Sequence, residues 1–222
     1  MNLKQVAGEK SVEYIKDGMV VGLGTGSTVF YAIKKIGEKV KNGLDIVAIP
    51  TSVETEKLAK QIGIQLSTLE EHPVIDVTID GADEIDKKLN LIKGMGGALL
   101  REKIVASASK KEVIVADDSK LVDMLGTRTP LPVEVARFGW SYAAKKISEL
   151  GCKTELRKKD GEIFITDNGN YILDCKFNKI DKPEEMEQKI NNIPGVLENG
   201  LFIGLADVAV VASDKGVKVI EK

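Results

Sequence analysis

Histidine, tryptophan and cysteine are scarce in this sequence, whose 222 residues contain one histidine, one tryptophan and two cysteines. His72 follows two glutamates and precedes Pro73, a setting in which an exposed residue is more common than a catalytic one. A Ser–His–Asp hydrolase would therefore lack its base. Cys152 and Cys175 stand far apart without CxxC spacing, so we interpret both as reduced packing residues.

An excess of charge of either sign is also absent. The sequence has 32 Lys and Arg against 34 Asp and Glu, which gives a formal net charge of -2. A protein that binds nucleic acid usually carries a positive excess or a basic run with interleaved aromatics. We therefore expect no nucleic-acid partner, although a basic pocket for a small anion is compatible with this balance.

Long apolar runs are missing as well. No run approaches the roughly 20 residues that a membrane-spanning helix needs. Residues 1–18 are charged every few positions and lack the apolar segment of a signal peptide. We therefore expect no membrane association and a cytoplasmic location. Hydrophobic residues make up 43% of the chain, as in ordinary globular proteins, and the length allows a large domain with a smaller companion.

Strand-like and helix-like patterns alternate through the first part of the chain. Residues 19–23 are a short apolar run typical of a buried strand, and a glycine-rich stretch separates them from a helical pattern over 29–40. Further strands are expected at 45–49, 74–80, 89–93 and 112–116, and further helices at 3–16, 53–62 and 98–109. This alternation predicts an α/β fold with a Rossmann-like, mostly parallel sheet and helices on both faces.

The pattern changes after Gly126. Pro130 and Pro132 introduce a strand through Ala136, and the Asp-Gly and Asn-Gly pairs of KKDGE and TDNGN are hairpin signals. Strands are expected near 153–157, 162–166, 170–176, 201–203 and 207–212, and helices near 140–150 and 184–191. We predict a large α/β domain formed by 1–127 and 197–222, and a small α+β domain formed by 128–196.

Polar or glycine-rich stretches follow five of the predicted strands: GTGST, PTS, DGAD, KGMGG and DDSK. Ligands of parallel sheets bind at the carboxyl ends of the strands. The five stretches are therefore expected to meet at one edge of the sheet and to form a ligand site there.

The GTGST stretch, residues 24–28, resembles the glycine loops that offer backbone N–H groups to a phosphate. A dinucleotide-binding loop would have glycine at position 27, which is Ser27, and an acidic residue near Ile49. The nucleoside-triphosphate motif GxxxxGK[ST] is absent too. We expect no organic cofactor. The alternative for these glycines is that they only allow close packing of a helix on the sheet.

Four charged residues, Asp80, Asp83, Lys93 and Glu102, gather in one stretch. The aspartates could bind a metal or cap a turn, but no histidine is near and the spacing is not that of a calcium loop. Lys93 precedes several glycines and could stabilise an oxyanion. Glu102 falls near the start of a helix, where a carboxylate can act as a general base, although it could also belong to a solvated helix face.

A phosphate-binding loop, a base and an oxyanion-stabilising cation together suit proton transfer next to a carbonyl. Aldose–ketose isomerisation of a sugar phosphate through an enediolate is such a reaction. An aminosugar-phosphate deaminase, a sugar-phosphate-sensing binding module and a CoA transferase remain alternatives at this point.

The motifs GLGTGSTV, DGADEID, KGMGGALLREKIVA, ADDSK and LPVEV, in this order and spacing, resemble ribose-5-phosphate isomerase of the A type. The similarity continues through TDNGNYILD and IPGV. The resemblance implies interconversion of D-ribose 5-phosphate and D-ribulose 5-phosphate in the non-oxidative pentose phosphate pathway, without a required metal or cofactor. It also implies a homodimer or homotetramer, and a ferredoxin-like fold for the smaller domain.

The resemblance further implies roles for individual residues. Glu102 would be the proton acceptor, and Asp80, Asp83 and Lys93 would be the other catalytic residues. The substrate-binding residues would be Lys4, Thr25, Gly26, Ser27, Thr28, Gly81, Ala82, Gly94, Met95, Gly96 and Lys120. Met95 stands where the family usually has glycine, so its side chain is expected to turn away from the sugar.

Overall fold

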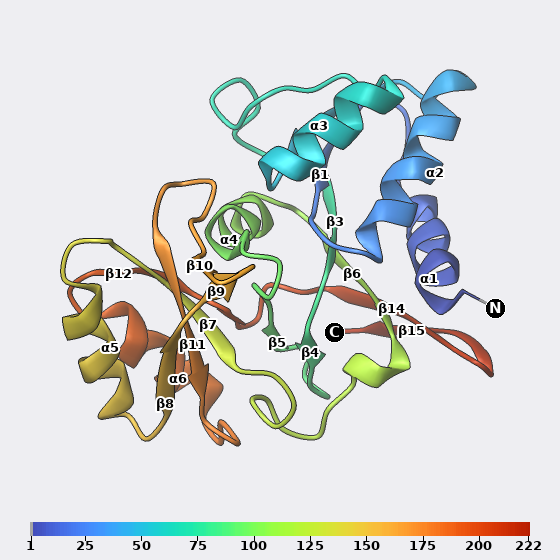
Figure 1. Ribbon diagram of the computed structural model, residues 1–222. Coiled ribbons are helices and arrows are strands. Elements are labelled where there is room, and N and C mark those ends of the chain that lie inside the picture. Colours follow the sequence, from blue (N-terminus) through green and yellow to red (C-terminus); the bar gives the residue numbers. More distant parts are fainter. Residues whose placement is uncertain (1) are drawn as a thin grey trace. The chain divides into compact units, whose positions relative to one another are not determined.

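A computed structural model describes residues 2–222 (Figure 1), and its contacts divide the chain into two compact units. The first unit takes in the chain up to Ala82, Arg101–Lys120 and Gly204–Lys222, and the second takes in Asp83–Leu100 and Leu121–Ile203. The domain limits expected from the sequence differ, because they group 83–100, 121–127 and 197–203 with the large domain. Those limits remain a prediction.

The first unit contains a six-stranded sheet in the order β15-β14-β6-β3-β1-β2. Its strands are β1 (Met19–Leu23), β2 (Ile46–Pro50), β3 (Val77–Gly81), β6 (Glu112–Asp117), β14 (Val208–Ser213) and β15 (Gly216–Glu221). All neighbours are parallel except β14 and β15, which form an antiparallel hairpin. The strand order reverses between β1 and β3, and such a switch point is where open α/β sheets bind ligands.

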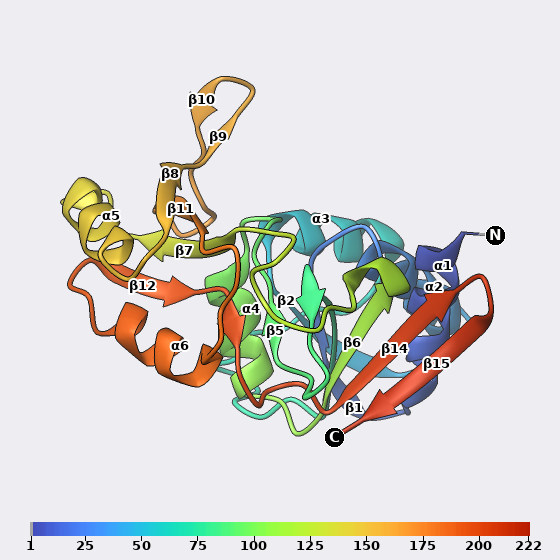
Figure 2. The same ribbon diagram turned by 90° about the horizontal axis from the view of Figure 1, so that it is seen from below.

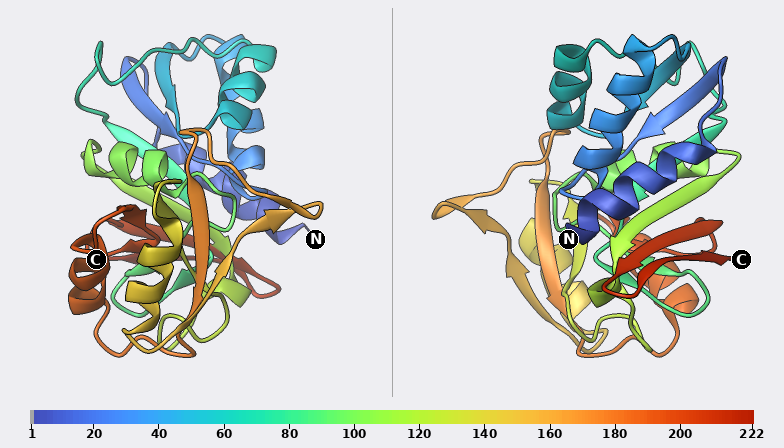
Figure 3. Two further views of the ribbon diagram at one scale, coloured as in Figure 1. Left: turned by 60° about the vertical axis from the view of Figure 1, so that its left-hand side comes forward. Right: turned by 90° about the vertical axis from the view of Figure 1, so that its right-hand side faces the viewer.

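The helices of the first unit are α1 (Leu3–Ser11), α2 (Val29–Lys41), α3 (Val53–Ile62) and α4 (Leu99–Ser107). One face of the sheet, which includes Val21 and Val113, packs in a single core with α1, α2 and α3. On the other face Val105 of α4 packs with Ile49 and Val20. Figure 3 shows α1 and α2 lying along the same side of the sheet. The predicted mostly parallel sheet with helices on both faces is confirmed.

The second unit contains a four-stranded antiparallel sheet in the order β12-β7-β11-β8. Along the chain its elements are β7 (Leu131–Val135), α5 (Trp140–Ser148), β8 (Lys153–Leu156), β11 (Tyr171–Lys176), α6 (Pro183–Asn191) and β12 (Val196–Asn199). The βαββαβ sequence and this strand order are those of a ferredoxin-like fold, which confirms that prediction. A small hairpin, β9 (Lys158–Lys159) with β10 (Glu162–Ile163), projects from this sheet in Figure 2.

A separate three-stranded sheet supports the lysine–glycine stretch of the second unit. Its strands are β4 (Glu84–Ile85), β5 (Leu91–Ile92) and β13 (Leu201–Phe202), and β5 lies in the middle with antiparallel neighbours. Lys93 extends β5, because its N–H donates to the carbonyl of Gly200 at 2.9 Å. The stretch that begins at Lys93 is therefore attached directly to a buried sheet.

Candidate active site

The sequence-predicted site residues are distributed over both units. The first unit holds Lys4, Thr25, Gly26, Ser27, Thr28, Asp80, Gly81, Ala82, Glu102 and Lys120, and the second holds Asp83, Lys93, Gly94, Met95 and Gly96.

The glycine loop, residues 24–28, connects β1 to α2 and lies against the end of β3. A Cβ atom on Gly24 would stand 2.1 Å from Oδ1 of Asp80 and 2.6 Å from its Cα, so only glycine fits at that position. Asp80 is completely buried, and its Oδ1 accepts the N–H of Thr25 at 3.1 Å and of Gly81 at 2.7 Å. One carboxylate thus holds the glycine loop and the end of β3 together at the switch point.

A buried hydroxyl cluster supports the glycine loop from the side of β2. Oγ1 of Thr25 lies 2.8 Å from the hydroxyl oxygens of both Thr51 and Ser52, and 3.3 Å from that of Thr55. Thr51 and Thr55 also donate to the carbonyls of Leu23 and Gly24, at 3.1 and 2.8 Å. The PTS stretch therefore anchors the loop. The sequence reasoning selected that stretch as polar but missed its supporting role.

A cation reaches the glycine loop from α1. Nζ of Lys4 donates a hydrogen bond to Oγ of Ser27 at 2.9 Å. Gly8, one turn further along α1, makes this approach possible, because a Cβ atom there would stand 2.7 Å from the carbonyl oxygen of Thr28. An ammonium group, a hydroxyl and the start of α2 thus lie together, which is a suitable environment for a phosphate.

Glu102 lies in the first turn of α4 and is 5% exposed, and Lys103 beside it is 7% exposed. This burial is unlike that of a solvated helix face. Val105, one turn later, packs on the sheet so closely that a Cβ atom on Gly22 would stand 2.8 Å from its Cγ1. Glu102 is thus a buried carboxylate at the positive end of a helix that covers β1. Lys120 ends a short 3-10 turn directly after β6.

In the second unit, Lys93 is 2% exposed and its ammonium lies 5.3 Å from the ring centroid of Phe202 in β13. This is a cation–π contact in a desolvated setting, where such contacts are strongest. Gly200 is required beside it, since a Cβ atom there would stand 2.2 Å from the carbonyl oxygen of Lys93. Sequence reasoning missed Phe202 and Gly200, whose letters alone do not reveal that β13 pairs with β5.

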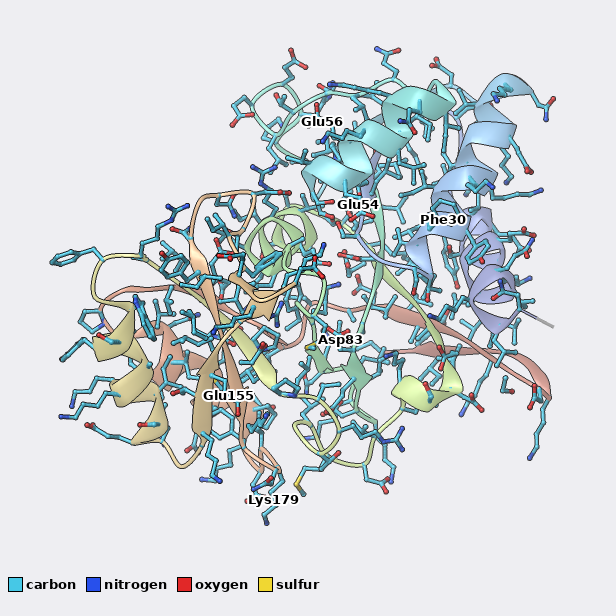
Figure 4. The ribbon with its side chains drawn as sticks, in the orientation of Figure 1. Phe30, Glu54, Glu56, Asp83, Glu155 and Lys179 are labelled. Carbon is cyan, nitrogen blue, oxygen red and sulfur yellow. The ribbon has the colours of Figure 1, made fainter. Side chains whose placement is uncertain are left out.

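Asp83, labelled in Figure 4, directly precedes β4 and contacts the stretch that follows Lys93. Its Oδ2 accepts the N–H of Met95 at 3.0 Å. The side chain of Met95 is exposed, and its Sδ lies 3.8 Å from Nη2 of Arg157. Gly94 and Gly97 have φ angles of 109° and 83°, which glycine adopts without strain.

Within residues 2–222, no three His, Cys, Asp or Glu side chains gather as a possible metal site. None of the helices in this part of the chain is long and apolar enough to cross a membrane.

Known proteins resemble this chain over its whole length. The family model of ribose 5-phosphate isomerase A (phosphoriboisomerase A) matches residues 47–216. Ribose-5-phosphate isomerase A of Bacillus mycoides (strain KBAB4) is 55% identical over 219 residues, which cover 98% of this chain and 99% of that protein.

Two solved structures have the same fold over the whole chain. Ribose 5-phosphate isomerase A from Methanocaldococcus jannaschii superimposes with a TM-score of 0.95 at 43% identity, over 100% of this chain and 99% of that one. A D-ribose-5-phosphate isomerase in complex with phospho-erythronic acid gives a TM-score of 0.97 at 44% identity, over 100% of both chains.

Proposed function

Because the chain belongs to the ribose 5-phosphate isomerase A family, we propose that it interconverts D-ribose 5-phosphate and D-ribulose 5-phosphate in the non-oxidative pentose phosphate pathway. The observation that carries this proposal is the match, over 100% of both chains, to an isomerase bound to phospho-erythronic acid. That ligand combines a phosphate with a planar carboxylate, whose shape and charge are those of an enediolate. Neither a sugar-phosphate sensor nor an aminosugar-phosphate deaminase is favoured by these matches.

Glu102 is the proton carrier in this proposal. In the open-chain aldose its carboxylate removes the proton from C2, and the electron pair moves so that an enediolate forms across C1 and C2. Returning the proton to C1 gives the ketose, while a hydroxyl proton passes from O2 to O1. Burial at the start of α4 supports the assignment, because a base there is shielded from water and held in one place.

Lys93 and the glycine amides that follow it oppose the negative charge of the enediolate. The Lys93 ammonium is buried against Phe202, so its field is weakly screened. In other enzymes, loss of one such donor raises the barrier by roughly 3–4 kcal/mol. Asp80 and Asp83 hold or polarise the sugar hydroxyls, and one of them assists ring opening.

The glycine loop holds the phosphate in this proposal. Thr25, Gly26, Ser27 and Thr28 offer N–H and hydroxyl groups at the start of α2, and Lys4 is already hydrogen-bonded to Ser27. Lys120, which follows β6, supplies a second cation. Gly81, Ala82, Gly94, Met95 and Gly96 complete the proposed set of substrate-binding residues.

A coupled enzyme assay that follows the conversion of ribose 5-phosphate to ribulose 5-phosphate, with and without a chelator, tests the proposed function. We expect conversion in both conditions, because the proposed chemistry uses no metal or cofactor. Loss of activity with chelator would contradict the metal-free part of the proposal. Ammonia release from an aminosugar phosphate would favour a deaminase, and binding of ribose 5-phosphate without turnover would favour a sensor.

Assembly and location are also part of the proposal. The resemblance to type A isomerases supports a homodimer or homotetramer, and light scattering on the purified chain would distinguish these from a monomer. The similarity to a family of metabolic enzymes supports a cytoplasmic location.

A further inference from the structure

An arginine of the ferredoxin-like sheet contacts the lysine–glycine stretch, residues 93–97. Arg157 directly follows β8, and its N–H continues the pairing with β11 by donating to the carbonyl of Ile172 at 2.8 Å, while its carbonyl accepts the N–H of Phe164 at 3.0 Å. The side chain is 9% exposed. Its guanidinium makes two parallel hydrogen bonds to Asp174 of β11, from Nε to Oδ2 at 3.0 Å and from Nη2 to Oδ1. This bidentate pair sets the plane of the guanidinium.

The remaining edge of the guanidinium reaches two consecutive carbonyls. Nη1 of Arg157 donates to the carbonyl oxygen of Gly94 at 2.7 Å and to that of Met95 at 3.2 Å. Asp174, Arg157 and the stretch 93–97 therefore form one connected chain of hydrogen bonds. Lysine could not form it, because an ammonium lacks the planar fork that binds Asp174 and both carbonyls together.

These two hydrogen bonds determine where the N–H groups of the stretch point. In a trans peptide the carbonyl and the N–H of the next residue point in opposite directions, and the described chain has no cis peptides. Because the Gly94 carbonyl faces Arg157, the Met95 N–H points away from it, where it donates to Asp83 at 3.0 Å. Because the Met95 carbonyl also faces Arg157, the Gly96 N–H points away from the guanidinium.

We propose that Arg157, held by Asp174, is a positioning residue for the isomerase reaction. It orients the peptide planes 94–95 and 95–96, so that the Gly96 N–H is directed toward the substrate and the Asp83 carboxylate is held by Met95. This inference rests on the proposed function, because it assigns the orientation of donors in that same site.

Arg157→Ala tests the proposal, and Arg137→Ala is its matched control. Arg137 lies in the same unit, donates from Nε to the Gly169 carbonyl at 2.6 Å and stacks on Tyr171, so its guanidinium is held at the start of β11 and not at residues 93–97. We expect kcat of Arg157→Ala to fall by about 10²-fold with a smaller change in KM, since misplacement of catalytic groups by about 1 Å has that effect. Millimolar guanidinium ion should restore part of kcat in Arg157→Ala and none in Arg137→Ala.

Arg157→Lys provides a second test if Arg157→Ala does not fold. It keeps the charge but loses the fork, so its kcat should also fall while its melting temperature stays close to that of the wild type. An unchanged kcat in Arg157→Lys, or an equal loss in Arg137→Ala, would overturn the proposal. Inactivity of the wild-type chain on ribose 5-phosphate would instead overturn the proposed function, so the two failures are distinguishable.

Discussion

Glu84, the buried carboxylate of the DGADEID motif, provides a stability prediction that separates it from its neighbour Asp83. Oε2 of Glu84 accepts the N–H of Gly126 at 2.6 Å. Oε1 accepts the N–H groups of Arg128 and Thr129, both at 2.7 Å, and the Thr129 hydroxyl at 3.2 Å. This carboxylate thus accepts four hydrogen bonds from the turn at Gly126–Thr129, which leads into β7. Glu84→Gln should therefore destabilise the fold.

The magnitude follows from the number of donors. A hydrogen bond to a charged group contributes roughly 1.5–3 kcal/mol, about twice a neutral one. When the glutamine carbonyl takes the place of Oε1, the NH₂ group faces one donor, the N–H of Gly126, and the other bonds become neutral. Relief of the buried charge offsets part of the loss. We expect the free energy of unfolding to fall by about 2–4 kcal/mol.

Urea denaturation of Glu84→Gln measures this change, and Glu155→Gln is the control. Glu155, labelled in Figure 4, pairs with Lys176 at 3.0 Å with side-chain exposures of 63% and 50%. Such exposed pairs contribute about 0–1 kcal/mol. Equal midpoints for the two variants would refute the reasoning.

Two further predictions concern the first unit. Gly24→Ala should lower kcat by about 10²-fold, because the new Cβ would stand 2.1 Å from Asp80 and must shift the glycine loop; steady-state kinetics that match the wild type would contradict this. Asp76→Asn should be less stable by about 1 kcal/mol at neutral pH. The hydrogen bond from Lys110 and the N–H of Val20 lower the pKa of Asp76, so its carboxylate stabilises the fold above its ordinary pKa and loses this effect as pH falls through the lowered pKa. Thermal unfolding at several pH values should therefore show the two proteins converging in acid; a constant gap would contradict the assignment.

The repeating strand–helix pattern could be predicted because each element carries its own signal. The apolar run 19–23 coincides with β1, and the helical pattern 53–62 coincides with α3, whose N-cap is Ser52. Ligands bind at the carboxyl ends of parallel strands, and this rule predicts that GTGST and Asp80 lie together. The hydrogen bond from the N–H of Thr25 to Asp80 confirms that they do.

Other features depend on contacts between distant segments, which no local pattern reveals. The sequence analysis did not predict β15, an edge strand whose residues are mostly exposed and therefore lack an apolar signal. The sequence predicts a strand over 162–166, but the strand β10 spans only Glu162–Ile163, in a short hairpin with β9. In the sequence, Arg157 is one charged residue in a polar stretch. Its contact with Asp174 depends on the pairing of β8 with β11, which no local pattern predicts.

Solvent-deuterium incorporation by the wild type and by Glu102→Gln tests the central claim most directly. With ribose 5-phosphate in deuterated water, we expect deuterium at C1 in the fraction of ribulose 5-phosphate for which the proton on Glu102 exchanges with solvent before it returns. We expect that Glu102→Gln still binds the substrate but loses about 10²–10⁴-fold in the rate of conversion, since it lacks the base. Near-normal turnover by Glu102→Gln would contradict the assignment of Glu102 as the base.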